Sequence, residues 1–433
     1  MPRTFLLGMA GIAACALLAT GAWASGQQQK EVVLTCQKCE SSPTNVFFES
    51  RYEVVQAFNK QYAGRYRIDV QHYGGKDEND LSYMERLALA NAMPDIFVAQ
   101  STQLQTLAKT GKMMDFAPFL AKDAEWANSF YPDAFTSLKS ASGQVWGIPE
   151  ERDVVGIYYN KALFAKAGIS AFPATWDEFL ADCQKLKAAH VIPVAMDGDW
   201  VTQLMWANLI GTQPGGEQFL TSGIAKGGFS DNPIVVKATE FLKNLHTSGY
   251  VNQDAFTGDY PNAANPFLQE QAAMIANGPW MVQADITGKS ALPDLRSQVG
   301  YEISPGWTTD GRGAIVLAGN AGWGSGSRDP AKQEAVAAFT KFTTSPAIQL
   351  QRTLKTGAYW AVKLTLTPDQ VALLEPLTYS LVSSADKAKY HYPHAKFATT
   401  QPFTDAWKNY WPGYVQGTMS TKEFLDKLSA AEQ

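Results

Sequence analysis

The hydrophobic positions near the start of the chain follow two alternating spacings. Residues 31–35 form a short apolar run, residues 52–62 place large side chains three or four positions apart, and residues 66–72 alternate between apolar and polar. These patterns predict a strand, a helix and a second strand. A further helical pattern covers 81–92, and Pro94 ends it before the apolar stretch 95–99. This order predicts an α/β fold in which helices cover both faces of a parallel sheet.

Ligands bind to parallel sheets beyond the carboxyl ends of the strands. In the first half of the chain, that rule points to the segments that follow the three predicted strands. Gln100 and Ser101 follow the third strand directly, and polar residues occupy much of 39–49 after the first strand. We therefore expect Gln100, with its neighbours, to face a ligand.

The second half of the chain repeats the theme of strands and capped helices. Thr175 and Glu178 form a capping box, in which the hydroxyl and the carboxylate each satisfy a free amide at a helix start. The apolar stripe behind this box includes Cys183, which predicts a buried cysteine. Asp329 before Pro330 marks another helix start. No linker rich in glycine, serine or proline divides the halves, so we expect a second α/β lobe rather than an independent module.

The first 24 residues have the pattern of a secretory signal peptide. Arg3 precedes an apolar run that is shorter than the roughly 20 residues of a membrane anchor, and the small residues at 22 and 24 predict cleavage after Ala24. An alternative is lipidation at Cys15, although the apolar run continues beyond that residue. Both alternatives predict a protein that works outside the cytoplasm, in the periplasm or tethered to a lipid surface.

Composition and cysteine spacing narrow the range of functions. The 433 residues are long enough for two or more domains, and the net charge of −5 argues against a nucleic-acid partner, which requires a basic surface. Cys36 and Cys39 are spaced as C-x-x-C, but no second pair completes a zinc site. In an oxidising compartment this spacing favours a local disulfide.

Several ordered motifs carry a family resemblance. Residues 143–149 read GQVWGIP and residues 156–161 read GIYYNK, and related motifs recur at 163–168, 175–179, 272–280 and 321–324. Together they resemble the family 1 extracellular solute-binding proteins, the sugar receptors of ATP-driven (ABC) importers. The resemblance implies a two-lobed periplasmic-binding-protein fold of type II, with lobes joined by a hinge.

The resemblance also implies where the lobes divide. By analogy, the chain crosses between lobes near 146–149, near 301–306 and near 345–351. The expected amino-terminal lobe is 25–148 plus 304–348, and the expected carboxyl-terminal lobe is 149–303 plus 349–433. Gly147 and Pro149 are interpreted as hinge residues, with an ordinary turn as the alternative.

Sugar binding requires polar groups for the hydroxyls and aromatic rings for the apolar faces of the pyranose. Trp280 matches the family position whose indole stacks on sugar, and Trp323 lies between two glycines that let a ligand approach closely. For both tryptophans the alternative is a place in the core. Asp153, just beyond the first crossing, matches a position where the family often has a sugar-binding carboxylate.

Other candidates follow from their positions. Arg152 adjoins Asp153, and Glu150 and Glu151 are alternatives at the same edge of the cleft, although such a charge cluster is also typical of a solvated hinge. The remaining candidates are Asp199 and Trp200 at the end of the strand over 192–196, and Trp360 with Tyr359 in a segment where a proline that is frequent in the family is replaced.

No catalytic constellation is visible. His391 and His394 form H-x-x-H without a third ligand, and the chain contains neither a G-x-S-x-G nor a phosphate-loop motif. Adjacent Glu150 and Glu151 point apart rather than across a substrate, which disfavours a glycosidase pair. We therefore predict a binding protein without catalytic, cofactor or metal sites, and keep a periplasmic carbohydrate-active enzyme as the alternative.

The ligand class is the most open of these predictions. A polyamine receptor should concentrate carboxylates, and a phosphate-ester receptor should bring Arg or Lys together. The candidate set mixes carboxylates, one Arg and several Trp, which favours a neutral di- or oligosaccharide. The expected partners are the permease subunits of an ABC importer, and the expected oligomeric state is a monomer.

Overall fold

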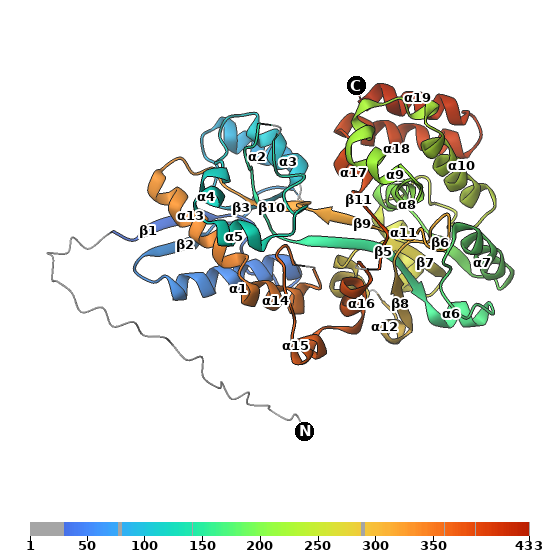
Figure 1. Cartoon of the computed structure of the whole chain (residues 1–433), viewed down its shortest axis with the longest axis horizontal. Coiled ribbons are helices and arrows are strands. Elements are labelled where there is room, and N and C mark those ends of the chain that lie inside the picture. Colours follow the sequence, from blue (N-terminus) through green and yellow to red (C-terminus); the bar gives the residue numbers. More distant parts are fainter. Residues whose placement is uncertain are drawn as a thin grey trace.

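The computed structural model describes residues 30–76, 80–140, 142–286, 291–358, 360–385 and 387–432. The signal segment with its two processing alternatives, at Ala24 and at Cys15, and Tyr359 lie outside the described residues. Figure 1 shows two lobes side by side, linked by long strands that run between them. The α/β class and the two-lobed architecture predicted from the sequence are confirmed.

The first lobe contains a parallel pair and a small three-stranded sheet. β1 pairs with β2 in parallel, an isolated bridge joins Cys36 to Ile96, and the three-stranded sheet has the order β3-β10-β4. The strands are β1 (Val32–Cys36), β2 (Tyr66–Val70), β3 (Phe97–Gln100), β4 (Ile148–Pro149) and β10 (Ala321–Gly324). The helices are α1 (Val46–Gln61), α2 (Leu81–Leu89), α3 (Ser101–Ala108), α4 (Ala117–Lys122), α5 (Ala124–Ser129), α13 (Pro330–Thr343) and α14 (Pro346–Thr356). The predicted strand–helix order at the start of the chain is therefore confirmed.

The second lobe is built on a mixed sheet with the order β11-β9-β5-β7-β6, and β8 also pairs with β5. Its strands are β5 (Arg152–Asn160), β6 (Ile192–Ala195), β7 (Ala272–Asn277), β8 (Val299–Glu302), β9 (Gly313–Ala318) and β11 (Tyr390–Tyr392). Its longer helices are α6 (Lys161–Lys166), α7 (Trp176–Ala188), α8 (Trp200–Gly211), α10 (Pro233–Thr247), α11 (Tyr260–Leu268), α16 (Pro376–Ala385), α18 (Gln401–Val415) and α19 (Thr421–Glu432). Its short helices are α9 (Gly216–Gln218), η1 (Phe219–Gly223), η2 (Ile224–Lys226), η3 (Phe229–Asp231), η4 (Val282–Ile286), α12 (Leu295–Gln298) and α17 (Ala395–Ala398). α15 (Pro368–Leu373) lies between α14 and α16 along the chain.

Local capping explains where several helices begin. The Thr175 hydroxyl accepts a hydrogen bond from the Glu178 amide, and the Glu178 carboxylate accepts one from the Thr175 amide, at 3.2 Å each. Asp329 accepts hydrogen bonds from the amides of Ala331 and Lys332. Both predicted starts are confirmed, because short-range side-chain caps depend only on neighbouring residues.

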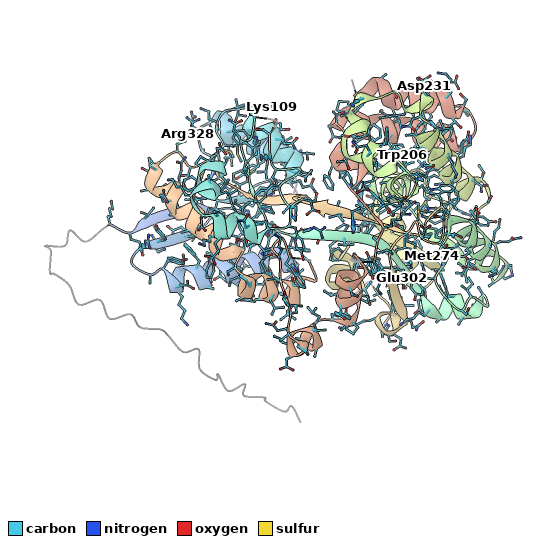
Figure 2. All side chains as sticks on the ribbon, viewed as in Figure 1. Lys109, Trp206, Asp231, Met274, Glu302 and Arg328 are labelled. Carbon is cyan, nitrogen blue, oxygen red and sulfur yellow. A yellow bond between two sulfur atoms is a disulfide. The ribbon has the colours of Figure 1, made fainter. Side chains whose placement is uncertain are left out.

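Each lobe has its own hydrophobic core. Trp206 and Met274 in the second lobe are fully buried, and Figure 2 labels both inside the packed side chains of that lobe. Cys183 is also fully buried in this core, as its place on the apolar stripe predicts, and burial raises the pKa of its thiol. α18 adds Trp407 and Trp411, whose rings stack at 5.0 Å.

The chain passes between the lobes in three places. β5 follows β4 into the second lobe, β9 leads back to β10 through Gly319 and Asn320, and the last passage lies between Val362 in the first core and Leu377 in the second. Gly319 has a φ of +65°, and an added Cβ would lie 2.5 Å from the Ala134 carbonyl oxygen. Glycine therefore suits this passage for both conformation and space.

The first passage coincides with the segment expected from the sequence, whereas the other two lie later in the chain than expected. β9 was expected in the first lobe, but its residues pair with β5 in the second sheet. The expected boundary after residue 348 gave most of α14 to the second lobe, but α14 packs against α1 in the first. The reason is that β9 and β10 are both short apolar strands, so their periodicity carries no sign of the change of lobe. That the lobes move about a hinge, and which residues move with each lobe, stay predictions.

Candidate ligand-binding cleft

A cavity of about 530 Å³ lies between the lobes and is lined from both of them. The first lobe contributes the ends of β1 and β3, part of α1 and the start of β10. The second lobe contributes residues from α8, α11 and α17, and the residue that follows the β7 turn. The lining residues are Lys38, Phe47, Arg51, Val98, Ala99, Gln100, Glu151, Trp200, Tyr260, Trp280, Leu317, Asn320, Ala321, His394, Lys396 and Phe397.

Three aromatic side chains form a wall on the second-lobe side. The rings of Trp200 and Trp280 have centroids 6.0 Å apart at 59°, and Trp200 stacks on Tyr260 at 5.0 Å and 27°. We call these three residues the aromatic wall. Aromatic side chains in a cavity lining are the kind of group that packs against the apolar face of a pyranose.

The position of Trp280 depends on the end of β7. The Tyr158 hydroxyl donates to the Gly278 carbonyl at 2.9 Å, and the Gly278 amide donates to the Asn277 side chain at 2.9 Å. A Cβ at Gly278 would lie 2.2 Å from the Trp280 ring. The glycine therefore leaves the space that the indole occupies.

Trp200 is held by the capped start of α8. The Asp197 carboxylate accepts hydrogen bonds from the amides of Asp199 and Thr202 at 2.9 and 3.1 Å. Burial raises the pKa of Asp197 to about 6, against the opposing effect of these amides. Tyr260 is held in a similar way, because its hydroxyl donates to Asp285 and accepts from the Asn277 amide.

A buried ion pair joins the first crossing to the first lobe. Arg51 in α1 donates to both carboxylate oxygens of Glu150, at 2.8 and 2.9 Å, and Arg352 donates to the Glu150 carboxylate and carbonyl. Burial would raise the pKa of Glu150, but the two guanidinium groups hold it below its usual value. Glu150 thus acts in the structure as an anchor of the crossing strand rather than as part of the cavity lining.

Glu151 differs from its neighbour. It lines the cavity, its Oε2 is buried, and that atom has no hydrogen-bond partner among the described residues. Burial raises the pKa of Glu151 well above its usual value, and repulsion from Asp153 and Glu150 adds to this effect. A carboxylic acid in its neutral form is able to donate a hydrogen bond to a ligand.

Comparison with known proteins supplies the family. The family described as "Bacterial extracellular solute-binding protein" matches residues 42–350. The chain belongs to this family. The family 1 resemblance seen in the motifs is thereby confirmed.

Two curated relatives have names that describe sugar binding. The multiple sugar-binding protein of Streptococcus mutans is 27% identical over 241 residues, 54% of this chain and 55% of that protein. The diacetylchitobiose binding protein DasA of Streptomyces coelicolor is 24% identical over 298 residues, 68% of this chain and 65% of that protein. The solute-binding protein thus spans between about half and two thirds of the length of these relatives.

Solved structures with the same fold cover nearly the whole chain. A chitin oligosaccharide binding protein has a TM-score of 0.74 at 24% identity, and covers 93% of this chain and 98% of that one. The raffinose complex of RafE has a TM-score of 0.68 at 19% identity, with coverages of 92% and 98%. At these identities the likeness shows the fold, which is that of type II periplasmic-binding proteins.

The cavity of the solute-binding protein contains three of the predicted site residues. Gln100, Trp200 and Trp280 all line it. Gln100 was predicted from the strand-end rule, and it follows β3 directly as that rule requires. The three residues come from distant parts of the sequence and from both lobes, so the fold brings them together. Their roles in binding stay predictions.

The other two predicted tryptophans do not line the cleft: Trp323 belongs to the first-lobe core, and Trp360 is buried. Trp323 is fully buried and packs edge-on against Phe339 at 5.1 Å. Its ring has no face open to a sugar, so a core role replaces the proposed stacking role. Trp360 is 3% exposed and does not line the cavity. For Trp323, a place in the core is the alternative stated above.

The predicted charged residues of the first crossing face other groups. Arg152 pairs with Asp133 at 3.0 Å and lies over the Tyr131 ring, 4.7 Å from its centroid. Asp153 is 2% exposed in β5, opposite Leu317. Neither residue lines the cavity, whereas Glu151, which directly precedes them, does.

Asp199 lies in an adjacent hollow. It pairs with Lys408 at 2.7 Å, and together they line a second cavity of about 650 Å³ beside α8. The structure therefore separates Asp199 from Trp200, its neighbour in sequence, because the residues lie at the turn into the helix.

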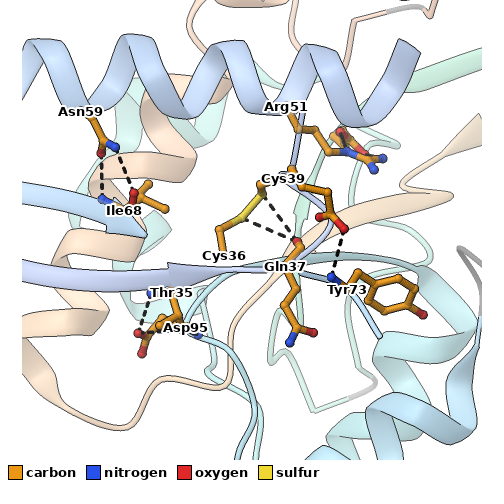
Figure 3. The surroundings of a disulfide bond; sticks show 11 residues. Thr35, Cys36, Gln37, Cys39, Arg51, Asn59, Ile68, Tyr73 and Asp95 are labelled. Carbon is orange, nitrogen blue, oxygen red and sulfur yellow. Dashed lines mark hydrogen bonds and ion pairs between the residues drawn. A yellow bond between two sulfur atoms is a disulfide. The ribbon is translucent and has the colours of Figure 1, made fainter. Parts of the chain in front are cut away.

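Cys36 and Cys39 form the predicted disulfide at the end of β1. Figure 3 shows this bond below α1, the helix that carries Arg51. The short loop that it closes contains Lys38, whose φ is +61° and whose side chain is buried at the cavity. The disulfide thus lies directly behind a lining residue.

Several lining residues were not predicted individually from the sequence. Lys38 directly precedes the range 39–49 that the strand-end rule indicated, and Phe47 lies within that range. Tyr260 begins a helix with Pro261 in its first turn, which is a signal for a helix start near a strand end. Lys396 and Phe397 had no such signal.

His394 was interpreted as a loop residue, and it lies at the N-cap of α17 with Nδ1 accepting from the Lys396 amide at 2.8 Å. Burial lowers the pKa of His394 to about 3, so the imidazole is neutral. In the described part of the chain, no group of three or more His, Cys, Asp or Glu side chains has the arrangement of a metal site. Among the residues that the structure describes, no helix is long and apolar enough to span a bilayer.

Proposed function

We propose that this chain captures a saccharide in the cleft between its lobes and delivers it to the permease of an ABC importer. The observation that carries the proposal is the aromatic wall of Trp200, Tyr260 and Trp280 on one side of a cavity between lobes. The names of the relatives, which describe multiple sugars, diacetylchitobiose and raffinose, support a saccharide as the ligand. A volume of about 530 Å³ suits a ligand larger than one sugar ring.

The polar lining supports the same proposal. Gln100, Asn320 and Glu151 offer amide and carboxyl groups at the cavity, and these side chains suit sugar hydroxyls. A polyamine receptor would require several carboxylates, whereas Glu151 is the only acidic residue among the described lining residues. The lining therefore disfavours a polycation as the ligand.

We further propose that the protein acts outside the cytoplasm, as a monomer and without catalysis. Lobe closure around the ligand would exclude water and strengthen hydrogen bonds in the cleft. The passages at 149–152, 318–321 and 362–377 are the proposed hinge segments. The proposed location follows from the family description and from the signal pattern in the first 24 residues.

A thermal-shift panel with product analysis tests the proposal. Purified mature protein is incubated with di- and oligosaccharides, and both the melting temperature and the saccharide composition are followed over time. A receptor gains stability as RT ln(1 + [L]/Kd) and leaves its ligand intact. A time-dependent product would establish the carbohydrate-active enzyme instead, and a panel without any stabilising saccharide would contradict saccharide capture.

A further inference from the structure

The charged residues of the cavity lining are unequal in sign. Lys38 and Arg51 contribute cationic groups from the first lobe, and Lys396 contributes one from the second. Arg51 pairs with Glu150, a carboxylate that it shares with Arg352, and Glu151 is the one acidic residue in the described lining. Ammonium groups also donate hydrogen bonds to neutral hydroxyls, but lysines from both lobes against one acidic residue give the lining an excess of positive charge, which an anionic ligand would offset.

Lys396 is the most informative of these cations. It lies in α17, which packs against α8 and thereby adjoins the aromatic wall. The carboxylate of Asp199 is near Lys396 but pairs with Lys408 at 2.7 Å. Within the described residues, no carboxylate lies within ion-pair distance of Lys396.

The surroundings of Lys396 disfavour its charged form while the cleft is empty. Burial lowers the pKa of Lys396, the ammonium of Lys408 lowers it further, and Asp199 and the more weakly acting Asp197 oppose this. His394, two residues before Lys396, is neutral. An ammonium that has lost much of its hydration without gaining an ion pair is stabilised when an anion arrives.

Glu151, the acidic residue in the described lining, is compatible with an anionic ligand. Burial raises the pKa of Glu151 well above its usual value, and the nearby carboxylates of Asp153 and Glu150 raise it further, which favours its neutral form. The residue lines the cavity, and its buried Oε2 has no hydrogen-bond partner among the described residues. A neutral carboxyl group donates a hydrogen bond to an anionic oxygen, whereas an ionised one would repel it.

We infer that the ligand is an anionic saccharide, whose carboxylate or phosphate ester binds the Lys396 ammonium while a sugar ring lies against Trp200 and Trp280. The inference rests on the proposed capture of a saccharide and adds the charge of the ligand. A uronate and a sugar phosphate share the chemistry that Lys396 recognises, since both present anionic oxygens to an ammonium. An anionic ligand differs from the neutral sugar that the sequence favours.

Matched pairs of saccharides test the inference by calorimetry. The carboxylate probes are α-1,4-digalacturonate with its dimethyl ester and 3′-sialyllactose with lactose, and the phosphate probe is glucose 6-phosphate with glucose. In at least one pair, we expect the anionic member to bind about tenfold or more tightly than its neutral partner. The pair that shows this preference distinguishes a carboxylate from a phosphate.

Variants test whether Lys396 is the group that recognises the negative charge of the ligand. Lys396→Gln should remove the preference for the anion, and Lys396→Arg should retain most of it. Lys109→Gln, an exposed lysine on α3's carboxyl end, is the matched control and should leave the preference unchanged. Loss of the preference in the control, or its persistence in Lys396→Gln, would overturn the role of Lys396.

The outcomes separate this inference from the proposed function. If neutral saccharides bind and no anionic member does, saccharide capture stands and the anionic ligand is refuted. Equal binding within every pair refutes it as well. If no saccharide of either class binds, both the proposed function and the inference fail.

Discussion

Arg51 and Glu150 lie 99 positions apart in the sequence and form two parallel hydrogen bonds, at 2.8 and 2.9 Å. Both side chains are almost fully buried, at 8% and 0% exposure. The pair joins α1 to the strand segment from which the chain enters the second lobe. A bidentate pair of this kind fixes orientation as well as distance, so it sets the position of Glu151 beside the cavity.

Removing the carboxylate at this crossing should be strongly destabilising. In Glu150→Gln, the guanidinium groups of Arg51 and Arg352 stay buried without their common counterion. The expected loss is about 3–5 kcal/mol in the free energy of unfolding, measured by urea denaturation. The matched control is Glu302→Gln, which breaks the partly exposed pair with Arg312 and should cost about 1 kcal/mol or less. Equal losses in the two variants would contradict the anchoring role of Glu150.

The disulfide should contribute to stability through the unfolded chain. Cys36 and Cys39 are only three positions apart in the sequence. Closing so short a loop in the unfolded chain should add about 2 kcal/mol to the free energy of unfolding. The double variant Cys36→Ala/Cys39→Ala should therefore unfold at lower denaturant concentration than the oxidised protein. Reductant should shift the wild type to the same midpoint and leave the double variant unchanged. A double variant as stable as the oxidised wild type would contradict this contribution.

His394 should make the protein less stable as the pH falls. Its pKa is lowered by burial from 6.5 to about 3, so below pH 6.5 the unfolded chain binds a proton that the folded protein does not. Stability is then lost progressively between pH 6.5 and about 3, and amounts to about 2 kcal/mol between pH 7 and pH 5. His394→Asn keeps a side-chain acceptor at the N-cap and should lack this loss.

The control for that experiment is His72→Asn, because the His72 side chain is 88% exposed. Urea denaturation at pH 7 and pH 5 should show the wild-type pH dependence in His72→Asn and a weaker one in His394→Asn. Identical pH dependence in all three proteins would show that His394 titrates normally.

Trp323 should matter for folding and not for binding. Trp323→Ala opens a cavity against Phe339 in the first-lobe core, at an expected cost of about 3–5 kcal/mol. Trp323→Phe should cost less and leave a folded protein whose saccharide affinity equals that of the wild type. A Trp323→Phe variant of wild-type stability that has lost its affinity would return Trp323 to the binding site.

Local patterns in the sequence predicted much of the fold. The alternation of strand and helix over the first hundred residues and the capping box at Thr175 and Glu178 depend on neighbouring residues, so periodicity reveals them. The passage from β9 to β10 depends instead on pairing with strands far away in sequence. The sequence pattern at Gly319 and Asn320 is that of any turn.

The site was predictable where a strand end or a family motif marked it, as for Gln100, Trp200 and Trp280. Trp323 lies in a motif of the same kind, but the face of β10 that carries its ring is decided by packing on α13. Lys38 and Lys396 are 358 positions apart in numbering and line one cavity. Only the arrangement of the two lobes in space shows that juxtaposition, so no local signal in the sequence indicated it.

The central claim is that the aromatic wall binds a saccharide, and titration calorimetry of Trp280→Ala tests it most directly. The titrant is the saccharide that stabilises the wild type most in the thermal-shift panel. Loss of the indole should weaken binding by about tenfold or more, Trp280→Tyr should restore part of the affinity, and the exposed aromatic control Tyr379→Ala should bind as the wild type does. A folded Trp280→Ala variant with the wild-type Kd and binding enthalpy would contradict the account.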